Sequence, residues 1–447
     1  MRPRPALVGL LLAVGCGNAR VSERAPFRRL TRAERAAARA GAALDARIGG
    51  DLEAAERLLR QAIALAPRSA DLHARLSLVL FTRGKRELAA AEFERVLEMS
   101  EFLALTRSRR DAYVPLANYL IAWYDKQGRQ ADVARVARRM AARHPEDPRY
   151  PLVEMRALLA LGRFDDAREP RARAERLDST GLETDRLFAQ YARTAKRFDL
   201  ALRSADRYLD RARALGFDAG FMRVWRARLL AEAGRPDEAA KAYAKIIGEE
   251  KVPHRRVQLA ISLAEMWANE KNTARTRAAA GDAARRVETA GLLPGEVALL
   301  RQRLAMALFA VRAYDACEAE LRAALEARPG NANAQNSLAY VLAVQGRSLE
   351  EAERLAKSAL EKAPNEPAFL DTLGWVYYRR GNLDRARELI SRAADAEPHA
   401  EVLEHLGDVE RALGNREAAR ESWKKALELE PERESSRKKL ESEQRKR

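Results

Sequence analysis

The sequence predicts an all-α protein built as a solenoid, a superhelix of stacked helix pairs. Three observations lead to this prediction. A turn signal returns with a period of 34 residues over most of the 447-residue chain. A small residue, usually alanine, stands five or six residues after each turn, where two helices would cross closely. Only 6% of the residues are aromatic although 47% are hydrophobic, and this composition suits many small helix–helix contacts.

The first residues of the chain have the layout of an export signal. Arg2 and Arg4 precede the uncharged run 6–14, and Gly15 stands directly before Cys16. The apolar run is about half of the roughly 20 residues that a helix needs to cross a bilayer, so a retained membrane span is disfavoured. The string LAVGC resembles the lipobox of bacterial lipoproteins, in which the cysteine is acylated and becomes the new N-terminus. It departs from the commonest form by having Ala in place of Leu three residues before the cysteine.

We therefore predict a signal peptide at residues 1–15, a lipid-anchored Cys16 and a tether over residues 16–35. Because each buried methylene adds about 0.8 kcal/mol, two or three acyl chains hold a protein stably on a membrane. The resemblance implies the periplasmic face of the bacterial outer membrane, since Gly17 is not the Asp that favours the inner membrane in the enterobacterial sorting rule. A plain secretory signal is the alternative. We interpret the basic tether as a solvated linker, with a membrane-surface role as its alternative.

Turn positions organise residues 36–433 into about eleven repeats. The gap of 78 residues between Gly234 and Arg312 equals two periods with an insertion, so a degenerate repeat is expected at residues 254–297. The polar residues 434–447 are expected to form a C-terminal cap or tail. The predicted turn positions are Gly50, Gly84, Gly128, Gly162, Lys196, Gly234, Arg312, Gly346, Gly381 and Gly414.

Each turn is followed by a crossing position and, in many repeats, by a proline. The expected crossing residues are Ala55, Ala89, Val133, Ala167, Ala201, Ala239, Cys317, Ala352, Ala386 and Ala419. Proline cannot continue a helix and so should end the second helix of its repeat. Such prolines are Pro67, Pro145, Pro329, Pro364, Pro398 and Pro431.

This pattern resembles the tetratricopeptide repeat (TPR), a 34-residue helix–turn–helix with the signature W-x2-L-G-x2-Y, A-x3-F and P. The best copy is LDTLGWVYYRRGNLDRARELISRAADAEP. Its residues on the family's positions are Leu370, Leu373, Gly374, Tyr377, Ala386, Ile390 and Pro398. Glu154 and Met155 depart from the expected Leu-Gly. The resemblance implies a TPR solenoid, a right-handed superhelix of antiparallel helix pairs. Its repeats must stack because each has too little apolar surface to stand alone.

Motifs that carry catalysis or hold cofactors are missing from the sequence. It contains no phosphate-binding loop, no dinucleotide fingerprint, no zinc-protease motif and no nucleophile elbow. With Cys16 and Cys317 as the only thiols, neither a disulfide framework nor a cysteine-based zinc site can form. Cys317 should pack as a slightly larger alanine, and His399 and His405 are six residues apart where a metal pair on one helix needs four. We therefore predict no enzyme, no cofactor and no metal.

A stripe of aromatic and polar residues runs beside the packed face of the best repeat. In repeats of this family, the corresponding stripe lines the inner groove. Rigid rings supply contact area to a partner and Asn can hydrogen-bond an extended backbone. The alternative is that Trp375 and Tyr378 pack against the next repeat. The predicted partner-binding groove consists of Asn336, Tyr340, Asp371, Trp375, Tyr378 and Arg379.

The same stripe is basic further toward the N-terminus. The chain has 82 Lys and Arg against 65 Asp and Glu, a formal charge of +17. Most of the excess is arginine, which a GC-rich genome also produces. The stripe therefore predicts a basic wall for an acidic partner or an anionic polymer, with a general arginine background as the alternative. The wall residues are Arg156, Arg186, Gln190, Arg193 and Arg228.

The last three repeats are similar to the C-terminal part of repeat-rich lipoproteins of Gram-negative bacteria. Some of these recruit carboxyl-terminal processing proteases to cell-wall hydrolases, and others assist pili or polysaccharide export. The resemblance implies a non-enzymatic, membrane-anchored periplasmic scaffold or adaptor that binds protein partners through an extended peptide or a helix. The alternative is a module for an anionic polymer: an envelope glycan, or RNA if the export signal is not real. Nucleic acid is disfavoured because only Phe188 and Tyr191 interleave the basic stripe.

Overall fold

The computed structural model describes residues 30–99, 113–178 and 180–444. Within these ranges the regular elements are 23 helices, without a strand, as an all-α solenoid requires. The chain divides into two compact units, residues 1–222 and 223–447, and each is described by itself. The predicted signal peptide and Cys16 lie outside the described residues.

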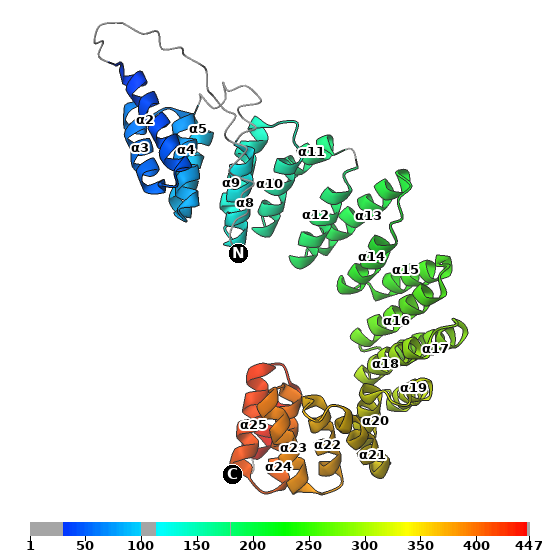
Figure 1. The fold of residues 1–447 in the computed structure, drawn as a ribbon. Coiled ribbons are helices and arrows are strands. Elements are labelled where there is room, and N and C mark those ends of the chain that lie inside the picture. The colour runs from blue at the N-terminus through cyan, green and yellow to red at the C-terminus, as the bar shows by residue number, and fades with distance from the viewer. Residues whose placement is uncertain (1–29, 100–112, 179, 445–447) are drawn as a thin grey trace. The chain divides into compact units, whose positions relative to one another are not determined.

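In the first unit, consecutive helices pair and the pairs stack in sequence order (Figure 1). Its helices are α2 (Arg32–Ile48), α3 (Leu52–Leu65), α4 (Ala70–Thr82), α5 (Arg86–Glu98), α8 (Val114–Lys126), α9 (Gln130–Arg143), α10 (Arg149–Ala160), α11 (Arg168–Leu177), α12 (Leu182–Thr194) and α13 (Phe198–Ala214). Helix α2 begins at Arg32, inside the tether that was predicted over residues 16–35. The cause is a capping box, in which Thr31 and Glu34 satisfy each other's backbone N–H groups.

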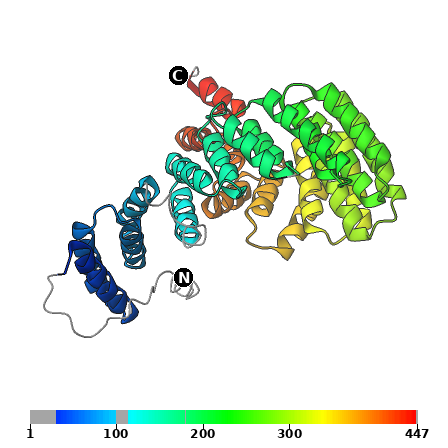
Figure 2. The same ribbon diagram turned by 90° about the horizontal axis from the view of Figure 1, so that it is seen from above.

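The second unit continues the pattern and ends on an extra helix (Figure 2). Helix α14 (Gly220–Glu232) contains the boundary between the units. It is followed by α15 (Pro236–Glu249), α16 (Pro253–Asn269), α17 (Thr273–Thr289), α18 (Pro294–Ala310), α19 (Tyr314–Ala327), α20 (Ala332–Gln345), α21 (Leu349–Lys362), α22 (Pro367–Arg379), α23 (Leu383–Ala396), α24 (Ala400–Ala412), α25 (Arg416–Leu429) and α26 (Glu434–Gln444). Among the described residues, no helix is long and apolar enough to cross a membrane.

All ten predicted turn positions have positive φ, including the two that are not glycine, Lys196 and Arg312. Glycine adopts this conformation at little cost, whereas other residues rarely do. Lys271 also has positive φ, between α16 and α17. It therefore marks the turn inside segment 254–297, whose two helices of 17 residues each exceed the 13 or 14 residues of α20–α25.

The crossing positions are buried as the period predicts. All ten predicted crossing residues are at most 1% exposed, and the crossing residue Ala386 is 0% exposed. A Cβ atom on Gly374 would lie 2.5 Å from Cγ1 of Ile390 and 3.2 Å from the Ala386 carbonyl oxygen. The backbone of one helix of this repeat therefore contacts side chains of the other. A larger side chain at Gly374 or Ala386 would clash. Each of the six predicted prolines stands two residues after the last residue of a second helix. This confirms that these prolines mark the helix ends.

We expect Ala386→Leu to destabilise the protein by about 1–3 kcal/mol, because the added methylenes overpack the α22–α23 crossing. In a stacked array the loss should spread mainly to neighbouring repeats. Hydrogen exchange of the full chain should show faster exchange over residues 367–433 than in the wild type. Equal loosening of residues 36–99 would contradict the repeat architecture and indicate one shared core.

Candidate functional site

The predicted groove residues lie on two consecutive first helices of the second unit. Asn336 and Tyr340 are on α20, and Asp371, Trp375 and Tyr378 are on α22. Neighbouring first helices contact one another, from α18 through α20 and α22 to α24. The structure brings Tyr340, Asp371 and Trp375 together around a residue of α24 that sequence reasoning treated as ordinary, His405.

Three aromatic rings stack at the centre of this site. The Trp375 ring lies 4.7 Å from the Tyr378 ring and 4.1 Å from the His405 ring, with interplanar angles of 23° and 20°. Trp375 and Tyr378 remain partly exposed, whereas His405 is buried. One side of Trp375 therefore packs against the next repeat, and the Trp375–Tyr378 pair still presents ring surface to a ligand.

A buried ion pair fixes His405. Its Nδ1 lies 3.0 Å from each carboxylate oxygen of Asp371, and both side chains are buried. Burial lowers the pKa of His405, but the carboxylates of Asp371, Glu401 and Asp408 together raise it by more, so the pKa is above its usual value. Tyr340 donates a 2.6 Å hydrogen bond to Glu401, and its hydroxyl is 3.5 Å from Nε2 of His405. Asp371 thus serves to orient His405 and, through it, the Trp375 ring.

Two polar atoms at the site have no hydrogen-bond partner among the described residues. They are Oδ1 of Asn336 and Nε1 of Trp375, and both atoms are buried. An unmet buried polar group costs about 1–3 kcal/mol. Native proteins keep few such groups, so a water or a ligand is expected to meet these two atoms.

Arg379, the last predicted groove residue, bonds to the backbone of the preceding repeat. Its side chain is exposed, and Nη1 donates a 3.0 Å hydrogen bond to the carbonyl oxygen of Val344 near the end of α20. A cation at a helix C-terminus is favourable because the last carbonyls carry partial negative charge. Arg379 therefore links the repeats that contain α20 and α22.

The stripe extends to α18, which carries none of the predicted groove residues. Met306 and Leu299 are each 59% exposed and lie one heptad apart. Met306, Tyr340 and Trp375 each stand six residues before the turn of their repeat, at Arg312, Gly346 and Gly381. This shared register is the sequence signal by which Met306 could have been added to the predicted groove. We call Met306, Tyr340 and Trp375 the inner stripe.

The C-terminal helix α26 is fastened beside the site through Glu404. This carboxylate accepts hydrogen bonds from Lys439, Ser435 and Ser436, at 2.6, 2.6 and 2.9 Å, and from Arg433. Burial raises the pKa of Glu404, but these hydrogen bonds outweigh burial and hold the pKa at about 2. The ionised carboxylate is thus the most connected of the groups that dock α26, beside the Lys439–Asp408 and Arg411–Glu443 ion pairs and the packing of Leu440 on Trp423.

We expect α26 to detach in acid. The pKa of Glu404 is depressed from 4.5 to about 2 on folding, so its contribution is complete above pH 4.5 and lost as the pH falls toward 2. The shift corresponds to about 3 kcal/mol. Hydrogen exchange should show α26 opening across this range, and Glu404→Gln should open it already at pH 7. Equal protection of α26 at pH 3 and pH 7 in the wild type would contradict this account.

The predicted basic wall does not form one free cationic surface. Arg156 pairs with Asp125 at 3.2 Å, and Arg186 pairs with Glu183 at 2.7 Å. Gln190 and Arg193 are exposed on α12. Arg228 belongs to the second unit, where it hydrogen-bonds Tyr243. Acidic neighbours thus neutralise Arg156 and Arg186, two of the four arginines in the predicted basic wall.

Cys317 packs as the sequence predicted. It is 1% exposed at the crossing between α18 and α19. Burial, with Glu320 and Glu318 nearby, raises the pKa of its thiol to about 12. The thiolate needed for a nucleophile is therefore scarce near neutral pH.

Family comparisons agree with this geometry. Models of the tetratricopeptide repeat match residues 41–104 and 303–367, residues 343–406 and residues 400–433. The chain carries tetratricopeptide repeats. A TPR solenoid is a scaffold for protein–protein interactions, and TPR proteins are in general non-enzymatic.

Individual relatives cover only parts of the chain. The TPR repeat-containing protein PA4667 of Pseudomonas aeruginosa is 32% identical over 182 residues, which is 40% of this chain and 29% of that protein. This chain therefore spans less than a third of that relative's length. In the solved structure of Naa15/Naa10 bound to HypK-THB, one chain is 16% identical with a TM-score of 0.41, covering 88% of this chain and 62% of its own. TTC0263, a thermophilic TPR protein of Thermus thermophilus, is 18% identical with a TM-score of 0.35, covering 42% and 98%. Both structural likenesses concern the fold alone.

Proposed function

We propose that this TPR protein is a non-enzymatic scaffold, lipid-anchored on the periplasmic face of the bacterial outer membrane, that holds a protein partner on the inner stripe. The observation that carries the proposal is the partly exposed Trp375–Tyr378 stack, held in place by the buried His405–Asp371 pair. Binding sites built on rigid aromatic anchors lose little side-chain entropy when a partner arrives.

The stripe suggests the form of the partner. Each of three consecutive first helices contributes one apolar or aromatic side chain at the same register, and packed helices lie about 8–10 Å apart. An extended peptide advances about 3.3 Å per residue. A peptide with apolar side chains at every third position would therefore place one side chain against each of Met306, Tyr340 and Trp375. A movement of the Asn336 or Trp375 side chain on binding would also allow the peptide backbone to satisfy their unpaired polar atoms.

The resemblance to repeat-rich lipoproteins nominates particular partners. These are a carboxyl-terminal processing protease, cell-wall hydrolases or an envelope assembly complex. A pull-down from detergent-solubilised envelopes tests the proposal, using wild type, Trp375→Ala and Trp267→Ala. Trp267 is a buried tryptophan on α16, away from the inner stripe. A partner retained by wild type and Trp267→Ala but lost with Trp375→Ala supports the groove; a partner retained equally by all three opposes it.

The anchor depends on Cys16. We expect Cys16→Ser to release the protein from membrane fractions or to leave the signal uncleaved, because no other residue can carry a thioether-linked lipid at this position. Cys317→Ser is the matched control and should remain in the membrane, since Cys317 lies in the packed core. A Cys16→Ser protein that stays membrane-bound at the wild-type level with a processed N-terminus would exclude lipid anchoring.

A further inference from the structure

A cationic cavity lies in the first unit, between the second helices α11 and α13. Its volume is about 320 Å³. Four arginines line it: Arg168 and Arg171 from α11, and Arg203 and Arg207 from α13. Phe188 of α12 and Ser204 of α13 complete its apolar and polar walls. This size is at the lower end of pockets that hold small organic ligands, and it exceeds the needs of a single water.

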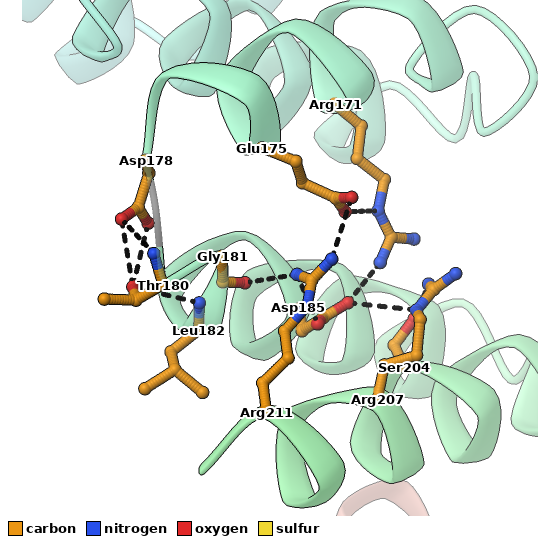
Figure 3. A network of polar contacts seen from close by, with 10 residues as sticks. All are labelled: Arg171, Glu175, Asp178, Thr180, Gly181, Leu182, Asp185, Ser204, Arg207 and Arg211. Atoms are coloured by element: carbon orange, nitrogen blue, oxygen red, sulfur yellow. Dashed lines mark hydrogen bonds and ion pairs between the residues drawn. The ribbon is translucent and has the colours of Figure 1, made fainter. Parts of the chain in front are cut away.

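Two carboxylates, one buried and one partly exposed, hold Arg171, Arg207 and Arg211 in place (Figure 3). Asp185 is fully buried on α12 and accepts from Arg171, from Arg211 at 2.8 Å and from Arg207 at 3.2 Å. Glu175 accepts from Arg171 at 2.8 Å and from Arg211 at 3.0 Å. The Arg171 guanidinium also lies 4.3 Å from the centre of the Phe188 ring. Two of the four lining arginines, Arg171 and Arg207, are therefore held in position before any ligand arrives.

Positive charge exceeds negative charge at the cavity. The four lining arginines and Arg211 stand near four carboxylates. These are Asp185, Glu175, Asp165, which pairs with Arg168 on the surface, and Asp178, whose charge acts on Arg211. This leaves one positive charge in excess. Arg203 is exposed, and within the described part of the chain it forms no ion pair. Its five N–H donors are free to meet an acceptor at the mouth of the cavity.

We propose that this cavity binds an oxyanion, the carboxylate or phosphate of a small organic molecule or the carboxylate of a partner's acidic residue. Planar guanidinium groups recognise such groups through paired charge-assisted hydrogen bonds. Arg203 reaches the ligand from the rim, while Arg171 and Arg207 form the wall behind it. The site lies on second helices of the first unit, so it is separate from the inner stripe and does not rest on the function proposed for it.

Titration calorimetry on the full-length protein tests the site at fixed ionic strength. The probes are citrate, inorganic phosphate and a hexaglutamate peptide. We expect saturable 1:1 binding of at least one probe, and loss of one charge-assisted arginine contact in Arg203→Gln should weaken it by about tenfold to a hundredfold. Tighter binding of citrate or phosphate would indicate a free small anion, and tighter binding of hexaglutamate would indicate an acidic partner segment.

The matched control is Arg213→Gln. Arg213 lies on the same helix, is exposed and pairs with Asp210 away from the cavity. It should leave the affinity unchanged, and both variants should keep the wild-type melting temperature because neither arginine is buried. Equal weakening by the two variants would show that the anion is attracted only by the general positive charge, which overturns the proposal. So would the absence of saturable binding by all three probes.

Discussion

Trp375→Ala should weaken binding of the envelope partner about thirtyfold or more. Truncating a buried aromatic anchor at a binding hot spot typically costs 2 kcal/mol or more, and each 1.4 kcal/mol is tenfold in affinity. Because Trp375 also stacks on His405, its removal should lower the melting temperature somewhat. The double variant Asn336→Ala, Tyr378→Ala should lower the affinity with a smaller effect on melting, since both side chains are partly exposed.

Trp267→Ala separates binding from stability. Truncating this buried tryptophan should cost about 3–5 kcal/mol and lower the melting temperature. The folded fraction should nevertheless bind the partner with wild-type affinity, because Trp267 lies on the packed side of α16. If Trp375→Ala behaves like Trp267→Ala, with a large loss of stability and normal binding, the rings at 375 and 378 belong to the core.

Asp185→Asn should destabilise the first unit by about 3–5 kcal/mol. Asn keeps the shape of the side chain but leaves Arg171, Arg207 and Arg211 around a buried site without its carboxylate. Denaturant unfolding, together with hydrogen exchange over α11–α13, measures the loss. Asp210→Asn is the control, because Asp210 is exposed on α13 and its pair with Arg213 is a surface salt bridge worth about 0–1 kcal/mol. Similar stability of the two variants would contradict a structural role for the buried cluster.

Local signals predicted most of the fold. Turns at positions 34 residues apart, small crossing residues and prolines after the second helices each follow from interactions within one repeat. Even Lys196 and Arg312, which lack the glycine of the other turns, have the left-handed conformation that their place in the period predicts. The turn at Lys271 was not predicted, because the helices of its repeat are longer. Its distances to the turns before and after it therefore both exceed the 34-residue period.

Contacts between repeats were harder to predict. The inner stripe could be placed in part, since Tyr340 and Trp375 share one register of their repeats. The role of His405 could not, because it depends on Asp371 in the preceding repeat, 34 positions earlier. The cationic cavity combines residues of three helices around Asp185, and none of its arginines stands out in a chain so rich in arginine. By contrast, the spacing of three between Glu183 and Arg186 was a readable sign that this part of the basic wall is neutralised.

Photo-crosslinking in intact cells tests the central claim, that the inner stripe holds a protein partner. A benzophenone amino acid would replace Tyr340 on the stripe and, in a control, Lys424, which is exposed on the second helix α25. We predict discrete protein crosslinks from position 340 and none of the same mass from position 424. The yield from position 340 should fall when Trp375→Ala is added to a protein that is still folded. Crosslinks of equal yield from both positions, or no crosslink from position 340, would contradict the claim.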